Sequence, residues 1–169
     1  MTGQSSRDTA GVWTPDEGFM RQAIAAAVWG IENGQTPFGA CIVSQDEVVA
    51  VAHNEVWRQT DPTAHAEVTA LRQACKKLDT IDLSGCVIYS TCEPCPMCFA
   101  ACHWAKLAAI VFGARIEDAR RAGFSELALS NSQMKQLGGS PLVIVPDFLR
   151  NEAVALFQTW AGSGHAAAY

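Results

Sequence analysis

The stretch that decides the fold of this 169-residue chain is Thr91-Cys92-Glu93-Pro94-Cys95-Pro96-Met97-Cys98. A β-rich segment, residues 86–90, precedes it, and Pro94 suits the first turn of a helix. Cys95 and Cys98 are three residues apart, so on a helical first turn their sulfur atoms point the same way. The stretch therefore predicts a buried strand followed by a helix whose N-terminus carries two thiols on one side.

A second stretch, Thr63-Ala64-His65-Ala66-Glu67, also stands where we expect a helix to begin after a loop. Zinc in proteins prefers about four nitrogen and sulfur ligands in tetrahedral geometry. His65 supplies a third ligand beside Cys95 and Cys98, and three protein ligands leave one position open for water. This is the arrangement of a catalytic zinc site, and it predicts that the two helix N-termini face each other.

Glu67 follows His65 by two residues, close enough to reach a water at the metal. Metal binding brings the pKa of such a water to about 7, and a carboxylate beside it can accept its proton and deliver a proton to a leaving amine. H-x-E alone is a weak signal and P-C-x-x-C a moderate one, but the ordered pair is the signature of zinc deaminases. The alternative is a closed structural zinc site with Cys92 or Cys102 as fourth ligand, which has no need for Glu67.

The rest of the chain alternates between helical and strand patterns. A helix begins at Thr14-Pro15-Asp16-Glu17, with Thr14 as its cap, and ends at Asn33-Gly34. We expect strands at 39–44, 48–53, 86–90, 109–113 and 142–145, a loop at 54–61, and helices at about 63–78, 94–104, 117–122, 126–137 and 147–160, the last capped by Asp147. This alternation predicts an α/β layered domain, and the early hairpin makes its sheet mixed.

Composition narrows the class of protein. At 49% apolar and 17% charged residues the chain can bury a full core, and its length suits one domain, which we place at residues 14–160. We expect residues 1–13 to form a loose leader without signal-peptide character, and residues 161–169 to form a flexible tail. No apolar run approaches a membrane span, and seven cysteines, an odd number, argue against a disulfide framework, so a cytoplasmic protein with free thiols is expected.

With His65-Ala-Glu67 and Pro94-Cys-Pro-Met-Cys98 in place, the chain resembles the cytidine-deaminase superfamily, and most of all its guanine deaminase branch. Supporting stretches are 36–40, 61–70, 103–105 and 122–124. The resemblance implies a three-layer α/β/α sandwich around a five-stranded mixed sheet. It also implies a zinc cofactor and hydrolysis of guanine to xanthine and ammonia.

The resemblance further implies a set of substrate-binding residues: Asn54, Phe38, Ala66, Trp104, Glu126 and Tyr169. In that branch Asn54 binds the ring or carbonyl edge of the purine, and Phe38 and Trp104 form apolar walls. Glu126 stands where the branch has an aspartate that contacts the base from the second chain. Enzymes of that branch are homodimers that exchange the C-terminal segment, and Tyr169 matches the aromatic end that closes the pocket. Whether the tail, residues 161–169, closes its own site or a partner's stays open at this point.

Each of these residues also has an ordinary structural interpretation. Phe38 could belong to the core, Asn54 to a turn, and Trp104 to helix packing. Glu126 could be an acid in the first turn of a helix, and Tyr169 a frayed chain end.

Other activities share this chemistry. Guanosine, cytosine, pterin or aminotriazine deamination would use the same zinc mechanism. The tRNA adenosine deaminases resemble the chain around both motifs, but a net charge of −5 disfavours binding to a phosphate backbone. A catalytically inactive, zinc-stabilised binding module is the alternative from another class, and the presence of Glu67 argues against it.

Overall fold

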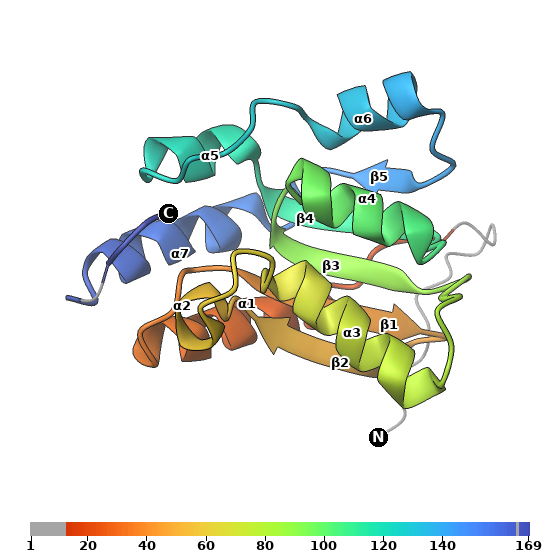
Figure 1. Cartoon of the computed structure of the whole chain (residues 1–169), viewed down its shortest axis with the longest axis horizontal. Coiled ribbons are helices and arrows are strands. Elements are labelled where there is room, and N and C mark those ends of the chain that lie inside the picture. The colour runs from red at the N-terminus through yellow and green to blue at the C-terminus, as the bar shows by residue number, and fades with distance from the viewer. Residues whose placement is uncertain (1–12, 165) are drawn as a thin grey trace.

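The computed structural model describes residues 13–164 and 166–169, and its centre is one five-stranded sheet with the order β2-β1-β3-β4-β5 (Figure 1). β1 runs antiparallel to both β2 and β3, whereas β3, β4 and β5 are parallel. The sheet is therefore mixed, as the sequence predicts. The strands are β1 (Gly39–Ser44), β2 (Glu47–His53), β3 (Val87–Cys92), β4 (Ala109–Ala114) and β5 (Val143–Val145).

Helices cover both faces of the sheet. They are α1 (Glu17–Glu32), α2 (Val56–Gln59), α3 (Ala66–Leu78), α4 (Pro96–Trp104), α5 (Ile116–Arg121), α6 (Asn131–Gly138) and α7 (Arg150–Ala161). α1 and α7 pack on one face, and α3 and α4 on the other, with α6 against α4 (Figure 1). The expected three-layer α/β/α sandwich is confirmed.

The alternation along β1 explains why both faces are filled. Ile42 points into the cluster that contains Leu71 of α3, while Cys41 and Val43 point into the cluster that contains Met20 of α1. Successive side chains of a strand leave opposite faces, so a strand covered on both sides is apolar at almost every position.

Gly39 shows how closely α1 and β1 approach. A Cβ at this residue would lie 2.0 Å from the carbonyl oxygen of Ala23 in α1, so no larger residue fits. The backbone N–H of Gly39 donates to Oγ1 of Thr91 at 3.0 Å. These contacts hold the start of β1 beside the end of β3, and Phe38, the residue before Gly39, lies at that edge.

Several predicted boundaries were wrong, each for a local reason. Asp16 caps α1 in place of Thr14, because its Oδ1 accepts the N–H of Gly18 at 2.6 Å. The predicted start of the second main helix at residue 63 or 64 moves to Ala66. The helix expected from residue 94 starts at Pro96, because the residue before a proline is pushed out of the helical region and Cys95 is extended.

Three further corrections concern loops. The loop expected at 54–61 contains α2. Residues 126–130 are not helical, because Ser130 and Gln133 form a capping box that starts α6 at Asn131. α7 begins at Arg150, not after Asp147, because Asp147 and Leu149 both adopt positive φ angles.

All seven cysteines are free thiols, as expected. Among the residues that the structure describes, none of the helices combines the length and apolar character that crossing a membrane requires. The predicted leader, apart from Trp13, lies outside the described residues.

Candidate active site

The chemistry-bearing residues meet at one edge of the sheet, where β1 begins and β2, β3 and β4 end (Figure 1). His65 is the extended residue directly before α3, and Cys95 is the extended residue directly before α4. The N-termini of α3 and α4 therefore meet, as predicted. Helix N-termini carry partial positive charge, which favours thiolates.

The three predicted ligands form a compact triangle. The Sγ atoms of Cys95 and Cys98 are 3.7 Å apart, and Nδ1 of His65 lies 3.7 Å from the first and 3.6 Å from the second. Zinc bonds of about 2.3 Å to sulfur and about 2.0 Å to nitrogen place tetrahedral ligands about 3.5–3.8 Å from one another. The donor set therefore fits zinc in both element and spacing.

The closed structural site does not form. Within residues 13–164 and 166–169, the group of side chains close enough to share an ion consists of His65, Cys95 and Cys98. Neither Cys92 nor Cys102 belongs to it, although both are buried nearby. Three protein ligands leave a coordination position free, which is the catalytic pattern.

The surroundings of Cys95 favour its thiolate form. The hydrogen bond with Cys98, and then the His65 ring, lower the pKa of Cys95 to about 4 against the opposing effect of burial. The thiolate is the form that binds metal ions.

Glu67 lies in the first turn of α3 with its carboxyl buried beside the ligands. Its Oε1 accepts the hydroxyl of Ser90 at 3.0 Å, and its Oε2 lies 3.5 Å from Sγ of Cys98. Burial raises the pKa of Glu67, because a charge is costly away from water. A carboxyl with a raised pKa, held at one orientation, is suited to accept and return a proton.

Asn54 is buried, and its amide has a defined direction. Oδ1 accepts the backbone N–H of Val56 at 3.1 Å, and Nδ2 donates to the hydroxyl of Tyr169 at 2.6 Å. The turn interpretation and the binding interpretation are thus compatible, because each end of the amide has its own partner.

A small cavity of about 10 Å³ lies beside these groups, enough for about one water. Its lining residues are Phe38, Asn54, His65, Glu67, Cys92, Glu93, Cys95 and Glu126. A more open depression of about 230 Å³ lies next to it, and His65, Cys95 and Glu126 border both. Tyr169 lines the open depression and reaches Asn54 in the small cavity.

The end of the chain lies over its own site. The backbone oxygen of Tyr169 accepts the N–H of Ser125 at 3.0 Å, and its ring centroid is 5.8 Å from that of His65. The indole N–H of Trp57 donates to the carbonyl of Ala167 at 3.1 Å. Residues 166–169 are therefore anchored in place of the expected loose tail. Of the two sites that the tail could close, its own or a partner's, it lies over its own in the single chain.

Phe38 and Glu126 both border the cavity. Phe38 makes edge-on contacts with Phe124 and Phe157, at ring centroid distances of 4.9 and 5.9 Å, so it packs in the hydrophobic core and also forms a wall of the cavity.

Glu126 lies in the loop before α6 and not in a helical first turn. It faces its own chain's cavity, where the resemblance implied the partner's. Burial, and then the charge of Cys95, raise the pKa of Glu126 to about 7.

The structure places two predicted residues differently. Ala66 is fully buried as the first residue of α3, between His65 and Glu67. Trp104 ends α4, about 12 Å along the helix from Pro96. Its side chain is 78% exposed and lines another depression, so it forms no wall in its own chain's site.

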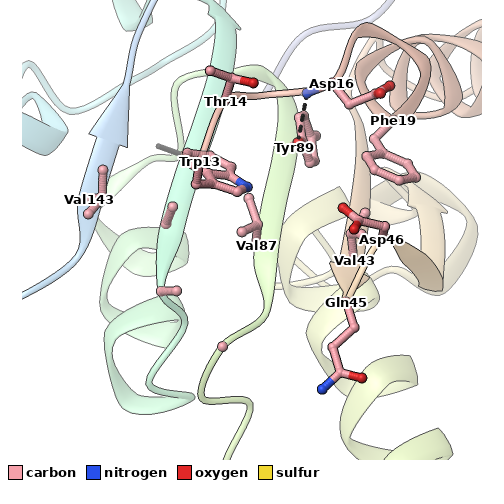
Figure 2. A pocket seen from close by; sticks show the side chains of 13 residues that line it. Trp13, Thr14, Asp16, Phe19, Val43, Gln45, Asp46, Val87, Tyr89 and Val143 are labelled. Carbon is pink, nitrogen blue, oxygen red and sulfur yellow. Dashed lines mark hydrogen bonds between the residues drawn. The ribbon is translucent and has the colours of Figure 1, made fainter. Parts of the chain in front are cut away.

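A larger cavity, about 390 Å³, lies at the opposite edge of the sheet (Figure 2). Trp13, Phe19, Val87 and Tyr89 are among its apolar lining residues, and the hydroxyl of Tyr89 accepts the backbone N–H of Asp16 at 3.1 Å. None of the described residues that line this cavity is a histidine or a cysteine, so it lacks the nitrogen and sulfur ligands that zinc prefers.

Comparison with known proteins now decides the family. Residues 14–114 match the cytidine and deoxycytidylate deaminase zinc-binding region. The chain belongs to this family. With its His/Cys/Cys group, it is a zinc-dependent deaminase.

Three relatives show how far the similarity extends. This deaminase is 45% identical to guanine deaminase of Bacillus subtilis (strain 168) over 111 residues, 65% of this chain and 71% of that one. It is 42% identical to tRNA-specific adenosine deaminase of Aquifex aeolicus (strain VF5) over 98 residues, 58% of this chain and 65% of that one. The structure of guanine deaminase from Nitrosomonas europaea superposes with a TM-score of 0.80 at 30% identity, covering 88% of this chain and 86% of that one.

Sequence reasoning did not single out Ser90, Trp57, Glu93 or Asn131. Glu93 lies within the quoted motif, but its partner Asn131 is distant in sequence and no local pattern connects them. Ser90 is an ordinary strand residue until its register places it beside Glu67.

Proposed function

We propose that this deaminase hydrolyses the 2-amino group of guanine, giving xanthine and ammonia. The observation that carries the proposal is the position of Tyr169, which covers the metal group and meets the buried amide of Asn54. A site enclosed in this way suits a free base more than a base within a polymer. The similarity to guanine deaminases supports the same substrate.

Zinc held by His65, Cys95 and Cys98 supplies a water nucleophile that is acidic enough to react near pH 7. Glu67 accepts a proton from the attacking water and delivers a proton to the departing amine. Water adds to C2, which forms the carbon–oxygen bond, and the carbon–nitrogen bond then breaks, so water and guanine become xanthine and ammonia. Ser90 keeps the Glu67 carboxyl oriented through both transfers.

The remaining polar groups orient the base. Oδ1 of Asn54 is engaged by the backbone N–H of Val56, so Nδ2 is the group that donates to a ring nitrogen or a carbonyl oxygen of the purine. The Glu126 carboxyl, whose pKa is raised to about 7, accepts a ring N–H in its charged form. The Phe38 ring forms the apolar wall against which the flat base packs.

The test is ammonia release from guanine, guanosine, adenine, cytosine, cytidine, pterins and aminotriazines, with zinc content measured on the same sample. We expect guanine to be turned over well above the others. Preferred turnover of another amine would retain the zinc mechanism and overturn the substrate. Zinc-loaded protein without turnover of any of them would contradict the proposal as a whole and favour an inactive binding module.

A second candidate is tRNA adenosine deamination, favoured by the similarity to the tRNA-specific adenosine deaminase. RNA binding needs a cationic surface, and the net charge of this chain is −5. An anticodon stem-loop added to the assay panel separates the two. Inosine formation in that RNA, with no turnover of guanine, would replace the first proposal.

We also propose a homodimer with an exchanged C-terminal segment as the working assembly, because the resemblance implies one. In that assembly the tail of the second chain would take the place over the site that the chain's own tail holds here. Exposed apolar side chains support an interface on this side of the molecule: Trp104 ends α4, Leu137 lies in α6, and Leu127 precedes α6. Sedimentation under assay conditions is expected to give a dimer, and an active monomer would refute it.

A further inference from the structure

The buried carboxyl of Glu93 connects two helices to the metal-binding loop. Its Oε1 accepts the N–H of Asn131, the first residue of α6, at 2.8 Å. Its Oε2 accepts the N–H of Ile116, the first residue of α5, at 3.4 Å. The first N–H groups of a helix have no partner within it, and a carboxylate can satisfy them. One side chain therefore anchors the start of both helices.

The side chain of Asn131 in turn binds the loop that carries Glu93. It is fully buried, and its Nδ2 donates to the carbonyl of Pro94 at 2.6 Å. Pro94 directly precedes the ligand Cys95. Glu93 and Pro94 are thus connected to Asn131 by two hydrogen bonds that run in opposite directions. We call this pair of bonds the Glu93–Asn131 clamp.

The clamp also bounds the segment that carries Glu126. α5 ends at Arg121 and α6 begins at Asn131, so residues 122–130 connect two helices whose first N–H groups both donate to the Glu93 carboxyl. Within residues 13–164 and 166–169, no hydrogen bond or ion pair holds the Glu126 carboxyl. Its position beside the cavity therefore depends on how the backbone of its segment is anchored.

We propose that Glu93 is a positioning residue, which acts through the clamp to place Glu126 opposite the metal group and so sets the affinity for substrate. This inference rests on the proposed function, in which Glu126 contacts the base. Glu93 borders the cavity, but both oxygens of its carboxyl are engaged by helix N–H groups. It transfers no proton and binds no metal.

The first variant is Glu93→Gln, which keeps size and replaces one acceptor oxygen by a donor. One of the two helix N–H groups then loses its partner. We expect KM for guanine to rise about tenfold, the scale of one lost hydrogen bond to a charged group. The value of kcat and the zinc content should stay near those of the wild type. Asn131→Ala removes the other half of the clamp and should act in the same way, so it serves if Glu93→Gln does not fold.

Ser130→Ala is the matched control. It removes the side-chain cap of α6, in which Ser130 Oγ accepts the N–H of Gln133 at 3.2 Å, and leaves the clamp intact. We expect lower thermal stability with an unchanged KM. If Ser130→Ala raises KM as much as Glu93→Gln does, the effect is general loosening of α6 and the inference fails.

A double-mutant cycle with Glu126→Gln tests whether Glu93 affects KM through Glu126. If Glu93 acts through Glu126, then Glu93→Gln adds nothing to KM in the Glu126→Gln background. Equal fold-changes in both backgrounds would overturn the inference, as would loss of zinc in Glu93→Gln, because the effect would then pass through the metal.

Hydrogen exchange on zinc-loaded protein tests the clamp without turnover. Amides of residues 122–130 should exchange faster in Glu93→Gln and not in Ser130→Ala. Unchanged exchange in Glu93→Gln would refute the clamp. If the wild type does not deaminate guanine, the proposed function fails. The exchange measurement still tests the Glu93–Asn131 clamp, because it does not depend on turnover.

Discussion

Nδ2 of Asn54 donates a hydrogen bond of 2.6 Å to the hydroxyl of Tyr169, the last residue of the chain. One of the two N–H donors of Nδ2 is thus engaged by the tail, and the cavity beside Glu67 has a volume of only about 10 Å³. Under the proposed function, we expect the tail to move when the substrate enters, because this cavity is too small for a base, and to enclose the base when it returns.

Removal of residues 162–169 takes away this cover without shortening α7, which ends at Ala161. We expect kcat/KM to fall on the order of 100-fold, because the substrate is no longer enclosed and held in place. Steady-state kinetics and thermal unfolding measure activity and fold separately. Tyr169→Phe is the matched variant, since it keeps the ring and loses the hydroxyl that bonds to Asn54, and should stay close to the wild type. A truncated protein with full activity would exclude the tail from catalysis.

Glu67→Gln keeps the shape of the side chain and removes its capacity to carry a proton. Turnover should drop by roughly 10²–10⁴-fold, the usual contribution of general acid–base catalysis. Zinc should remain bound, because Glu67 is not one of the three ligands. Ser90→Ala removes only the hydrogen bond that orients Glu67 and should cost less. Unchanged ammonia release by the Glu67→Gln protein would contradict the assigned role.

Replacing a ligand should remove the metal, whereas replacing a neighbouring cysteine should not. We expect Cys98→Ala to lose zinc, and Cys92→Ala and Cys102→Ala to retain it, because the last two thiols lie outside the ligand group. Metal analysis of purified proteins gives the stoichiometry. Loss of zinc on replacing Cys92 or Cys102 would contradict the three-ligand site and support a closed site with four protein ligands. A chelator should abolish activity, and added zinc should restore it.

Gly39→Ala tests the contact between α1 and β1. The new Cβ would lie 2.0 Å from the carbonyl oxygen of Ala23, so we expect the free energy of unfolding to fall by about 1–3 kcal/mol or more. Gly138→Ala in α6 is the control, because a Cβ there meets nothing within 4 Å and should raise stability by roughly 0.5–1 kcal/mol. Denaturant unfolding measures both. Equal stability of the two variants would show that the helix can shift.

Local patterns were enough for the five strands and the ligand set. The strands at 39–44 and 109–113 were predicted within one residue of their observed ends, because runs of apolar residues bounded by turns identify buried strands. Helix starts were harder, since side-chain caps such as Asp16 and Ser130 compete with equally plausible neighbours. Trp104 forms no wall in its own chain's site because it ends α4, whereas the ligands lie at the N-terminus of that helix.

The sequence by itself determined the zinc ligands and the class of reaction, because ligand chemistry depends on residue type and short spacing. Only the tertiary structure decided that the end of the chain lies over its own site, that Ser90 orients Glu67, and that Glu93 anchors two helices. These contacts join residues 23 to 115 positions apart. Such distances are bridged by packing of helices on a sheet, which no short pattern encodes.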